Sequence, residues 1–275
     1  MSQKTRKNAF NRITITVMIL LLTIFVMPYV WMILNSFKDK VEIAKARGFW
    51  PEVFTLKNYE RVFTESPIIN WFFNSVIVTV SGTLGMLFTC SISGFVFAKY
   101  EFKGKTILFT AVLATMMVPS QVTMIPSFLL IDRLHMYDTL FALIVPGIVG
   151  AYGMFMCKSF IEDIPDSLCE AAVIDGARDF YIYLHIIVPM IRPALGALTI
   201  FTFLGKWNDY LGPLLYLENP KKMTMPLALK YFSSRNSQDP GAIMAASALV
   251  TLPVTIVYLC MQKQFIKGIA ITGMK

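Results

Sequence analysis

Long runs of apolar residues restrict how this chain can fold more than any other feature of its sequence. A helix needs roughly 20 residues, at about 1.5 Å each, to cross a hydrocarbon core of about 30 Å. Six runs reach that length, at about 13–34, 72–98, 106–130, 137–157, 193–217 and 242–261. The sequence therefore predicts an all-α integral membrane protein with six transmembrane helices, which together form one domain over residues 13–261.

Composition and charge agree with a bilayer environment. Of the 275 residues, 56% are hydrophobic and only 15% are charged, whereas a soluble domain carries roughly a quarter charged residues. The net charge of +8 could suggest nucleic acid. However, the Lys and Arg residues lie in short segments between apolar runs, without the aromatic interleaving typical of RNA-binding proteins. We interpret the charge as a signal of membrane orientation and expect no nucleic acid partner.

The first apolar run follows a basic stretch, which raises the question of a cleaved signal peptide. The run is longer than the roughly 7–15 residues of a signal-peptide core, and it ends at Leu34-Asn35-Ser36-Phe37 without an A-x-A cleavage site. We expect it to remain as a membrane anchor.

Basic residues in the short connections predict the topology. Six spans place both termini on one side, and the basic N-terminus, 1–12, together with Lys99, Lys103 and Lys105, favours the cytoplasm. The external segments would be 35–71, a tight turn around 132–136, and 218–241. The cytoplasmic segments would be the connection 158–192 and the tail 262–275.

No pattern in the sequence indicates a metal site or catalytic chemistry. The four cysteines have no CxxC spacing, and the two histidines lie far apart without acidic or thiol partners at ligand spacing: Cys90, Cys157, Cys169, Cys260, His135 and His185. The chain also lacks a Walker A loop, HExxH and GxSxG. We expect no catalytic residue and no metal ligand, so an energy source for transport would have to be another chain.

The cytoplasmic connection contains a stretch, 164–179, with the signals of a short helix. Ser167 and Glu170 have capping-box spacing, Pro165 suits a helix start, and Gly176 suits a left-handed stop. Asp179 is placed to cap a second helix. Two consecutive short helices are therefore predicted.

The first of these helices has a face suited to contact with another protein. Small and apolar side chains recur at spacings of three and four residues, at Leu168, Ala171, Ala172 and Asp175. The loop is also rich in acidic residues, which positive-inside topology does not explain, so we expect it to meet a partner. The alternative is an amphipathic connector that packs on the bilayer surface.

The same stretch resembles a known motif. Glu170-Ala171-Ala172, then Gly176, Ile186 and Pro189 at the motif's spacings, resemble the EAA loop of permease subunits in binding-protein-dependent ABC importers. In that family the EAA helix is the coupling helix, which sits in a cleft of the ATPase subunit and moves with it. The resemblance implies an ATPase-coupling role for Glu170, Ala171, Ala172, Asp175, Gly176, Ala177, Ile186 and Pro189.

Other segments resemble the carbohydrate-uptake, MalG-like branch of these permeases. They are Trp50-Pro51 with 54–59, Lys206-Trp207-Asn208-Asp209-Tyr210 with Pro213-Leu214, and the ending 264–268 through Gly273. This resemblance implies a bacterial plasma membrane protein that imports a sugar, such as a di- or oligosaccharide. It implies a second, MalF-like permease, two ATPase subunits that bind ATP and Mg, and an external solute-binding protein docking on 35–71 and 218–241. The chain itself would bind no cofactor, and besides the sugar it would contact membrane lipid.

Polar residues inside the apolar runs suggest where a substrate passes. By helix rise, Lys206, Asn208, Asp209 and Gln121 lie at similar depth, close to the interruption of the fourth run at Pro146. Interrupted helices and polar groups in one layer indicate a translocation pathway. The candidate pathway residues are Gln121, Lys206, Trp207, Asn208, Asp209 and Tyr210, the aromatic rings stacking on a sugar and the polar groups binding its hydroxyls.

Alternatives remain at this stage. Lys206 and Asp209 could instead form a buried ion pair that fixes packing against a partner subunit. The whole chain could be an ABC permease for another solute, such as glycerol phosphate or an amino acid. A secondary transporter would need intramembrane carboxylates, for which Asp209 is the only deeply placed candidate, and an integral membrane enzyme would need the missing catalytic groups.

Overall fold

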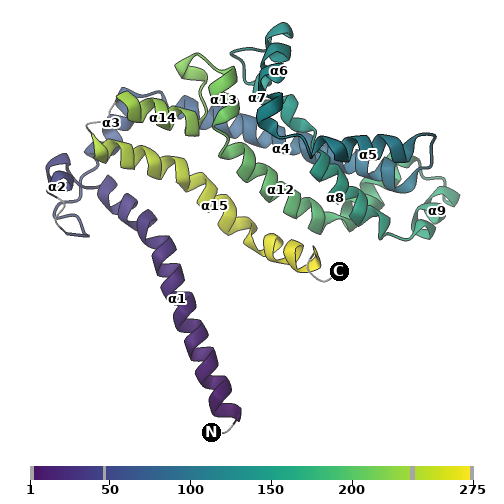
Figure 1. Ribbon diagram of the computed structural model, residues 1–275, viewed down its shortest axis with the longest axis horizontal. Coiled ribbons are helices and arrows are strands. Elements are labelled where there is room, and N and C mark those ends of the chain that lie inside the picture. The colour runs from purple at the N-terminus through teal and green to yellow at the C-terminus, as the bar shows by residue number, and fades with distance from the viewer. Residues whose placement is uncertain (1–2, 46–47, 236–238, 273–275) are drawn as a thin grey trace. The chain divides into compact units, whose positions relative to one another are not determined.

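The computed structural model describes residues 3–45, 48–235 and 239–272, and every regular element in these ranges is helical (Figure 1). This confirms the all-α class. Four segments are long and apolar enough to cross a membrane, namely Asn11–Ser36, Ile68–Lys99, Phe141–Glu162 and Pro240–Cys260. Two further helix pairs also qualify, each bent sharply at a break. The described chain thus has four candidate spans, or six if each bent pair is one span.

The chain divides into two compact units, of which the first comprises the described parts of 1–68 and 229–252. It contains α1 (Gln3–Ser36), α2 (Lys40–Ala44) and α3 (Lys57–Glu65), with parts of α14 (Met225–Arg235) and α15 (Pro240–Thr272). Apolar side chains of α1 are exposed from Ile13 to Ile33, as expected of a helix whose neighbours are lipid or another membrane protein.

Buried polar contacts shape the segment after α1. The Asn58 side chain is buried and donates hydrogen bonds to the carbonyls of Ser36 (2.8 Å) and Lys38 (2.7 Å). Ser36 and Tyr59 share a hydroxyl hydrogen bond of 2.7 Å. Arg61 of α3 forms an ion pair with Asp239, just before α15. This segment is therefore a folded part of the unit, because its buried polar groups are satisfied within it.

The second unit comprises the described parts of 69–228 and 253–275. Its longest helix is α4 (Ile68–Lys99), which contains no proline. The other elements follow in chain order: α5 (Lys105–Thr115), α6 (Ser120–Arg133), α7 (Phe141–Ile144), η1 (Pro146–Ile148), α8 (Ala151–Glu162), α9 (Asp166–Ile174), α10 (Asp179–Ile182), η2 (Tyr183–Ile187), α11 (Val188–Met190), α12 (Arg192–Trp207), α13 (Leu211–Tyr216) and η3 (Pro220–Lys222). Helix α8 packs against both α5 and α12.

A core cluster of buried apolar side chains fixes the short helices to the long ones. It includes Cys90 and Phe95 of α4, Cys157 of α8, Tyr183 of η2 and Leu198 of α12. The hydroxyl groups of Tyr183 and Ser91 of α4 share a hydrogen bond of 2.7 Å. The connection between the fourth and fifth predicted spans is thus anchored on α4 rather than free.

The third predicted span, 106–130, is not one straight helix. Helices α5 and α6 are bent by 101° at a break between Thr115 and Ser120. Pro119 explains the break, because its ring disfavours helical geometry at Val118 and it has no N–H to continue the ladder. Pro126, inside α6, does not interrupt the helix.

The fifth predicted span, 193–217, is also divided. Helix α12 ends at Trp207, and α13 starts only at Leu211. The Asp209 carboxylate accepts a hydrogen bond from the Gly212 amide at 3.1 Å, a local contact that competes with helix continuation. At its other end α12 is bent by 79° from 179–190, so the fifth crossing is built from short pieces.

The predicted boundaries of the fourth and sixth spans differ from the observed helices by a few residues at the start of the fourth span and by more at the end of the sixth. The fourth span starts as a helix at Phe141 rather than at 137 and extends to Glu162, with the predicted interruption at Pro146. The backbone of α15 continues to Thr272, through most of the predicted tail 262–275. Gly273 of that tail and the first two residues of the predicted N-terminal segment lie outside the described residues.

Candidate functional site

Helix α9, the predicted coupling helix, begins two residues earlier than its capping-box pattern suggests. It starts at Asp166 with Pro165 at the N-cap position, and no side chain caps it. The predicted pairing of Ser167 with Glu170 is therefore wrong. Pro165 sets the start instead, because proline needs no acceptor for an N–H and its fixed φ suits the helix entrance. Asp166 then adds a negative charge to the first turn, where it interacts well with the helix dipole.

The end of α9 confirms the predicted stop at Gly176. Gly176 has φ of +81°, in the left-handed region. Its N–H donates to the Val173 carbonyl (3.0 Å), and the Ala177 N–H donates to the Ala172 carbonyl (2.9 Å). These two bonds form a Schellman motif, which satisfies carbonyls that would otherwise lack partners at the helix end.

The side chains of the predicted motif separate into an inner and an outer set. Ala172, Ala177 and Ile186 pack against the core cluster of the second unit. On the outer side, Ile174 is 85% exposed. The other exposed members of this surface are Leu168, Glu170, Ala171, Val173 and Asp175. We call this exposed set the outer face of α9; its large apolar side chains are not covered by the described residues of the chain.

Pro189 lies where the backbone changes helical type. The five residues before α11, Tyr183–Ile187, form a π-helix, and the Val188 N–H donates to the Tyr183 carbonyl. A proline removes one N–H from the ladder, which favours such local rewinding. Pro189 therefore shapes the path from α9 to α12 and does not belong to the outer face.

Two residues outside the motif, the last residue of α4 and the one that follows it, hold α9 and α10 in place. The Lys99 ammonium donates to the Ile164 carbonyl and to the Asp166 carboxylate, both at 2.5 Å. The next residue, Tyr100, is hydrogen bonded to the Asp179 carboxylate; burial and this contact raise the pKa of Tyr100 to about 12. Asp179 thus bonds a tyrosine and does not cap α10, which starts at Asp179 itself.

Hollows flank this attachment on both sides. One, of about 380 Å³, is lined by Lys99, Cys169, Glu170 and Ile174 among others. A second, of about 460 Å³, lies beside Phe102 and Phe180 with a largely apolar lining. In Figure 1, α9 stands at one end of the second unit, next to the end of α4. The smaller hollow is continuous with the outer face, because Glu170, Val173 and Ile174 belong to both.

Trp207, a candidate for stacking on a sugar, is buried in the described chain. Its side chain is 1% exposed. Its ring stacks on Phe203 at 5.9 Å and meets Phe72 edge to face at 6.2 Å. The structure therefore assigns the Trp207 ring packing contacts with Phe72 and Phe203.

Lys206 and Asp209 do not form the ion pair considered from their spacing. Among the ion pairs of the described residues, none joins them. Asp209 instead bonds the Gly212 amide, as stated above. The Lys206 side chain runs into the second unit, where a Cβ on Gly82 would lie 2.9 Å from its Nζ and a Cβ on Gly147 would lie 2.1 Å from it. Both glycines thus leave room for Lys206.

The other candidate pathway residues lie near the surface of the described chain. Gln121 and Asn208 are exposed, and Tyr210 is partly buried. The Asn208 amide donates back to the Leu204 carbonyl at 2.9 Å. Of the candidate pathway residues, Lys206 lines a cavity, together with Gly147 of the fourth span. The sequence did not indicate this pairing, because glycines in apolar runs usually reflect close helix packing.

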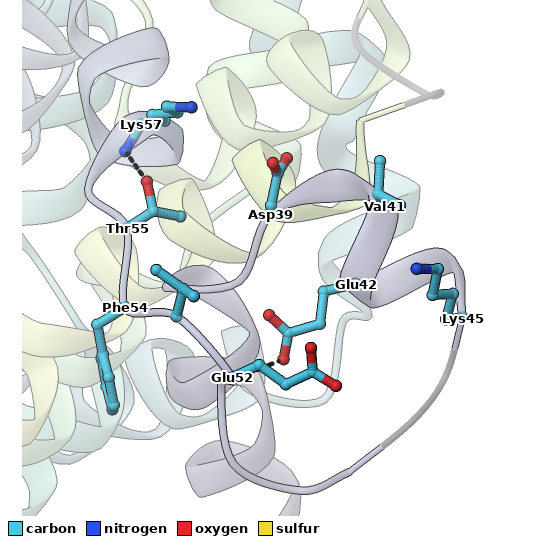
Figure 2. Close-up of a pocket in the computed structure, with 9 residues that line it drawn as sticks. Asp39, Val41, Glu42, Lys45, Glu52, Phe54, Thr55 and Lys57 are labelled. Carbon is cyan, nitrogen blue, oxygen red and sulfur yellow. Dashed lines mark hydrogen bonds between the residues drawn. The ribbon is translucent and has the colours of Figure 1, made fainter.

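The first predicted external segment also contains a hollow (Figure 2). It has a volume of about 460 Å³ and lies in the first unit. Three acidic residues and two lysines contribute to its lining, namely Asp39, Glu42, Glu52, Lys45 and Lys57. Glu42 accepts a hydrogen bond from the Glu52 amide at 2.9 Å, which links two parts of this segment that are ten residues apart in sequence. In the described part of the chain, no group of three His, Cys, Asp or Glu side chains could hold a metal ion.

The sequence matches a known family over most of its length. The family model of the binding-protein-dependent transport system inner membrane component matches residues 90–271. The chain belongs to this family. This permease is therefore a multi-pass membrane protein and a non-catalytic transport subunit, which excludes the secondary-transporter and membrane-enzyme alternatives.

Similar proteins align with the permease along almost its whole length. The arabinooligosaccharides transport system permease protein AraQ of Bacillus subtilis is 33% identical, over 96% of each chain. The diacetylchitobiose uptake system permease protein NgcG of Streptomyces coelicolor is 30% identical, over 93% of this chain and 86% of its own. The lactose transport system permease protein LacG of Rhizobium radiobacter is 30% identical, over 88% and 89%.

A solved structure supports the fold. A chain from the crystal structure of a bacterial ABC transporter involved in the import of the acidic polysaccharide alginate superposes with a TM-score of 0.85. The match covers 96% of this permease and 99% of that chain, at 22% sequence identity. At this level of identity the similarity establishes the fold, and this permease has the fold of an ABC importer permease.

Proposed function

We propose that this permease forms half of the translocation pathway of an ATP-driven sugar importer and that α9 is its coupling helix. The observation that carries the proposal is the outer face of α9, where Leu168, Val173 and Ile174 are exposed at the end of a tightly anchored helix. Exposed apolar groups on a rigid projection are typical of a protein contact. The acidic groups beside them keep this surface soluble until the partner binds.

The sugar part of the proposal rests on the relatives. AraQ, NgcG and LacG bear the names of permeases for arabinooligosaccharides, diacetylchitobiose and lactose. The most economical reading is that this chain carries a di- or oligosaccharide too. Glycerol phosphate or an amino acid remains the alternative solute.

The partners follow from the same assignment. Two ATPase subunits would bind ATP and Mg and contact α9 on the cytoplasmic side, where we place both termini. A second permease would cover exposed apolar helices such as α1. An external solute-binding protein would dock on 35–71, which includes the hollow of Figure 2, and on 218–241.

The coupling role can be tested by a substitution at one exposed position of α9 and by co-purification of the partner subunits. Ala171 is exposed on α9, whereas Ala172 packs inward, so a charge at Ala171 affects the outer face without disturbing the core. We expect the importer with Ala171→Glu to insert normally and to lose most sugar transport and sugar-stimulated ATP hydrolysis. Ala171→Ser, the matched control, should behave as wild type.

Two results would reject the proposal. One is a permease that purifies from its native membrane without an ATPase and a second permease. The other is normal transport by Ala171→Glu, because a carboxylate in a tightly packed interface leaves a charge without a partner.

A further inference from the structure

The Lys206 side chain ends at the middle of the longest helix of the second unit. Gly82, which it contacts, is 14 residues from the start of α4 and 17 from its end. At about 1.5 Å per residue, Lys206 therefore does not reach toward either end of α4. Lysines near the ends of membrane helices extend to the interface, whereas this one is directed inward.

Two glycines make room for the ammonium group. A Cβ at Gly82 would lie within 2.9 Å of Lys206 Cδ, Cε and Nζ, and a Cβ at Gly147 within 2.1 Å of Nζ. Gly147 lies in the 3₁₀ turn η1 that interrupts the fourth span. A residue larger than glycine at either place would displace the lysine, so α4, η1 and α12 together define its position.

A cavity of about 320 Å³ lies beside Lys206. Its lining includes Met86 of α4, Gly147 and Gly150 around the interruption, and Leu198 and Thr202 of α12. Tyr152 and Thr202 are the other polar side chains of this lining, and the Thr202 hydroxyl is directed to the Met86 sulfur at 3.1 Å. Lys206 is the one charged residue among those that line this cavity.

No partner for this charge is found within the part of the chain that the structure describes. None of the ion pairs of described residues includes Lys206. Asp209, the acidic group that acts on it electrostatically, bonds the Gly212 amide instead. An ammonium in an apolar, membrane-embedded cavity is costly unless an anion compensates it.

We propose that this cavity is a substrate subsite and that Lys206 binds the anionic group, a carboxylate or a phosphate, of an acidic saccharide. The inference rests on the proposed function and narrows its substrate class. Neutral hydroxyls would accept hydrogen bonds from the ammonium but leave its charge uncompensated. A carboxylate or phosphate provides both the charge and the acceptors.

Ligand binding to the purified importer, with both permeases and the ATPases but no solute-binding protein, tests the proposal. The probes are radiolabelled trigalacturonate and its neutral counterpart α-1,4-galactotriose, which differ only in their carboxylates, and galactose 6-phosphate with its neutral counterpart galactose. We expect wild type to bind at least one anionic probe about tenfold or more tightly than its neutral counterpart. Preference for trigalacturonate assigns a carboxylate; preference for galactose 6-phosphate alone assigns a phosphate.

Three variants connect the preference to Lys206. Lys206→Arg should retain it, since the charge remains, and Lys206→Met should abolish it. Gly147→Ala keeps the lysine but displaces its ammonium, so it should weaken the preference for the anionic probe. It replaces Lys206→Met as the test if the importer with Lys206→Met does not assemble. Equal binding of charged and neutral probes, binding of none, or a preference that survives Lys206→Met would overturn the proposal. An importer whose ATPase still responds to its sugar-loaded binding protein would then leave the proposed function intact.

Discussion

Lys99, the last residue of α4, forms an ion pair with Asp166, the first residue of α9, with 2.5 Å between Nζ and Oδ1. The Lys99 side chain is 7% exposed and the Asp166 side chain is 77% exposed. The ammonium also bonds the carbonyl of buried Ile164. The exposed carboxylate contributes little, since surface ion pairs are worth about 0–1 kcal/mol. The contact with the Ile164 carbonyl is the stronger part of the attachment.

Lys99→Met should loosen α9 from α4. The substitution leaves the Ile164 carbonyl without its donor, at a cost of about 1–3 kcal/mol. We expect the ratio of sugar transported to ATP hydrolysed, measured in proteoliposomes, to fall on the order of tenfold. Asp166→Asn should have a much smaller effect.

The matched control is Lys103→Met, an exposed lysine of the same short connection. If Lys99→Met and Lys103→Met couple transport to ATP hydrolysis equally well, α9 does not depend on this attachment.

Gly176→Ala should destabilise the end of α9 without a steric clash. No atom lies within 4 Å of the added Cβ, so the cost is the left-handed backbone alone, roughly 1–2 kcal/mol. Hydrogen exchange of the α9 amides should become faster. Gly176→Asn should be milder, because asparagine tolerates this region; faster exchange in the asparagine variant than in the alanine variant would contradict the backbone explanation.

Gly147→Ala should lower the thermal stability of the importer, because its new methyl group would occupy the position of the Lys206 ammonium. Gly205→Ala is the control, since a Cβ there meets no atom within 4 Å. Adding Lys206→Ala to Gly147→Ala should restore much of the loss, as expected for neighbours that share one space. Additive melting-temperature changes would show that the two positions do not meet.

Asp138 should make stability depend on pH at the acidic end. It lies in the turn before α7, accepts hydrogen bonds from the Glu218 and Asn219 amides, and pairs with Lys222 at 2.7 Å. Burial raises its pKa, but Lys222 and the amides outweigh this and lower it below the ordinary 3.8. The carboxylate thus stabilises the fold above that pH, and its contribution is lost as the pH falls below it.

Asp138→Asn removes the carboxylate charge and keeps the shape of the side chain, so it tests whether the charge causes the pH dependence. Asparagine keeps an acceptor oxygen and tolerates the positive φ of 53° found here. Its melting temperature should be lower than wild type at pH 7, with the difference shrinking toward pH 3. A constant difference across that range would argue against the Lys222 pairing.

Much of the fold could be predicted because apolar length and local stop signals depend on nearby residues only. The helical class, the interruption at Pro146 and the left-handed stop at Gly176 all follow from such signals. The breaks at Pro119 and Asn208 were missed because the apolar runs continue across them. In the first case a proline outweighs hydrophobicity; in the second, a carboxylate bonds the chain ahead of it.

Only the part of the candidate site that lies in one continuous segment of the sequence could be predicted. The sequence identified α9 but not Lys99 or Tyr100, which lie more than 60 residues before it. Lys99 had served only to indicate membrane orientation, and no pattern had pointed to Tyr100. It placed Trp207 in the pathway, whereas Phe72 and Phe203 enclose its ring. Such long-range contacts have no periodic pattern that one sequence could display.

Helix α4 connects the contact with α9 to the cavity beside Lys206, because Lys99 is in its last turn and Gly82 is near its midpoint. It is 32 residues long without a proline, or about 48 Å of continuous hydrogen-bonded backbone. A helix without an internal proline lacks the commonest cause of a sharp kink. A force on α9 at the membrane surface would therefore reach the bilayer centre as a tilt or a translation of the whole of α4. The timing of solute release would then depend on the strength of the contacts between Lys99 and α9.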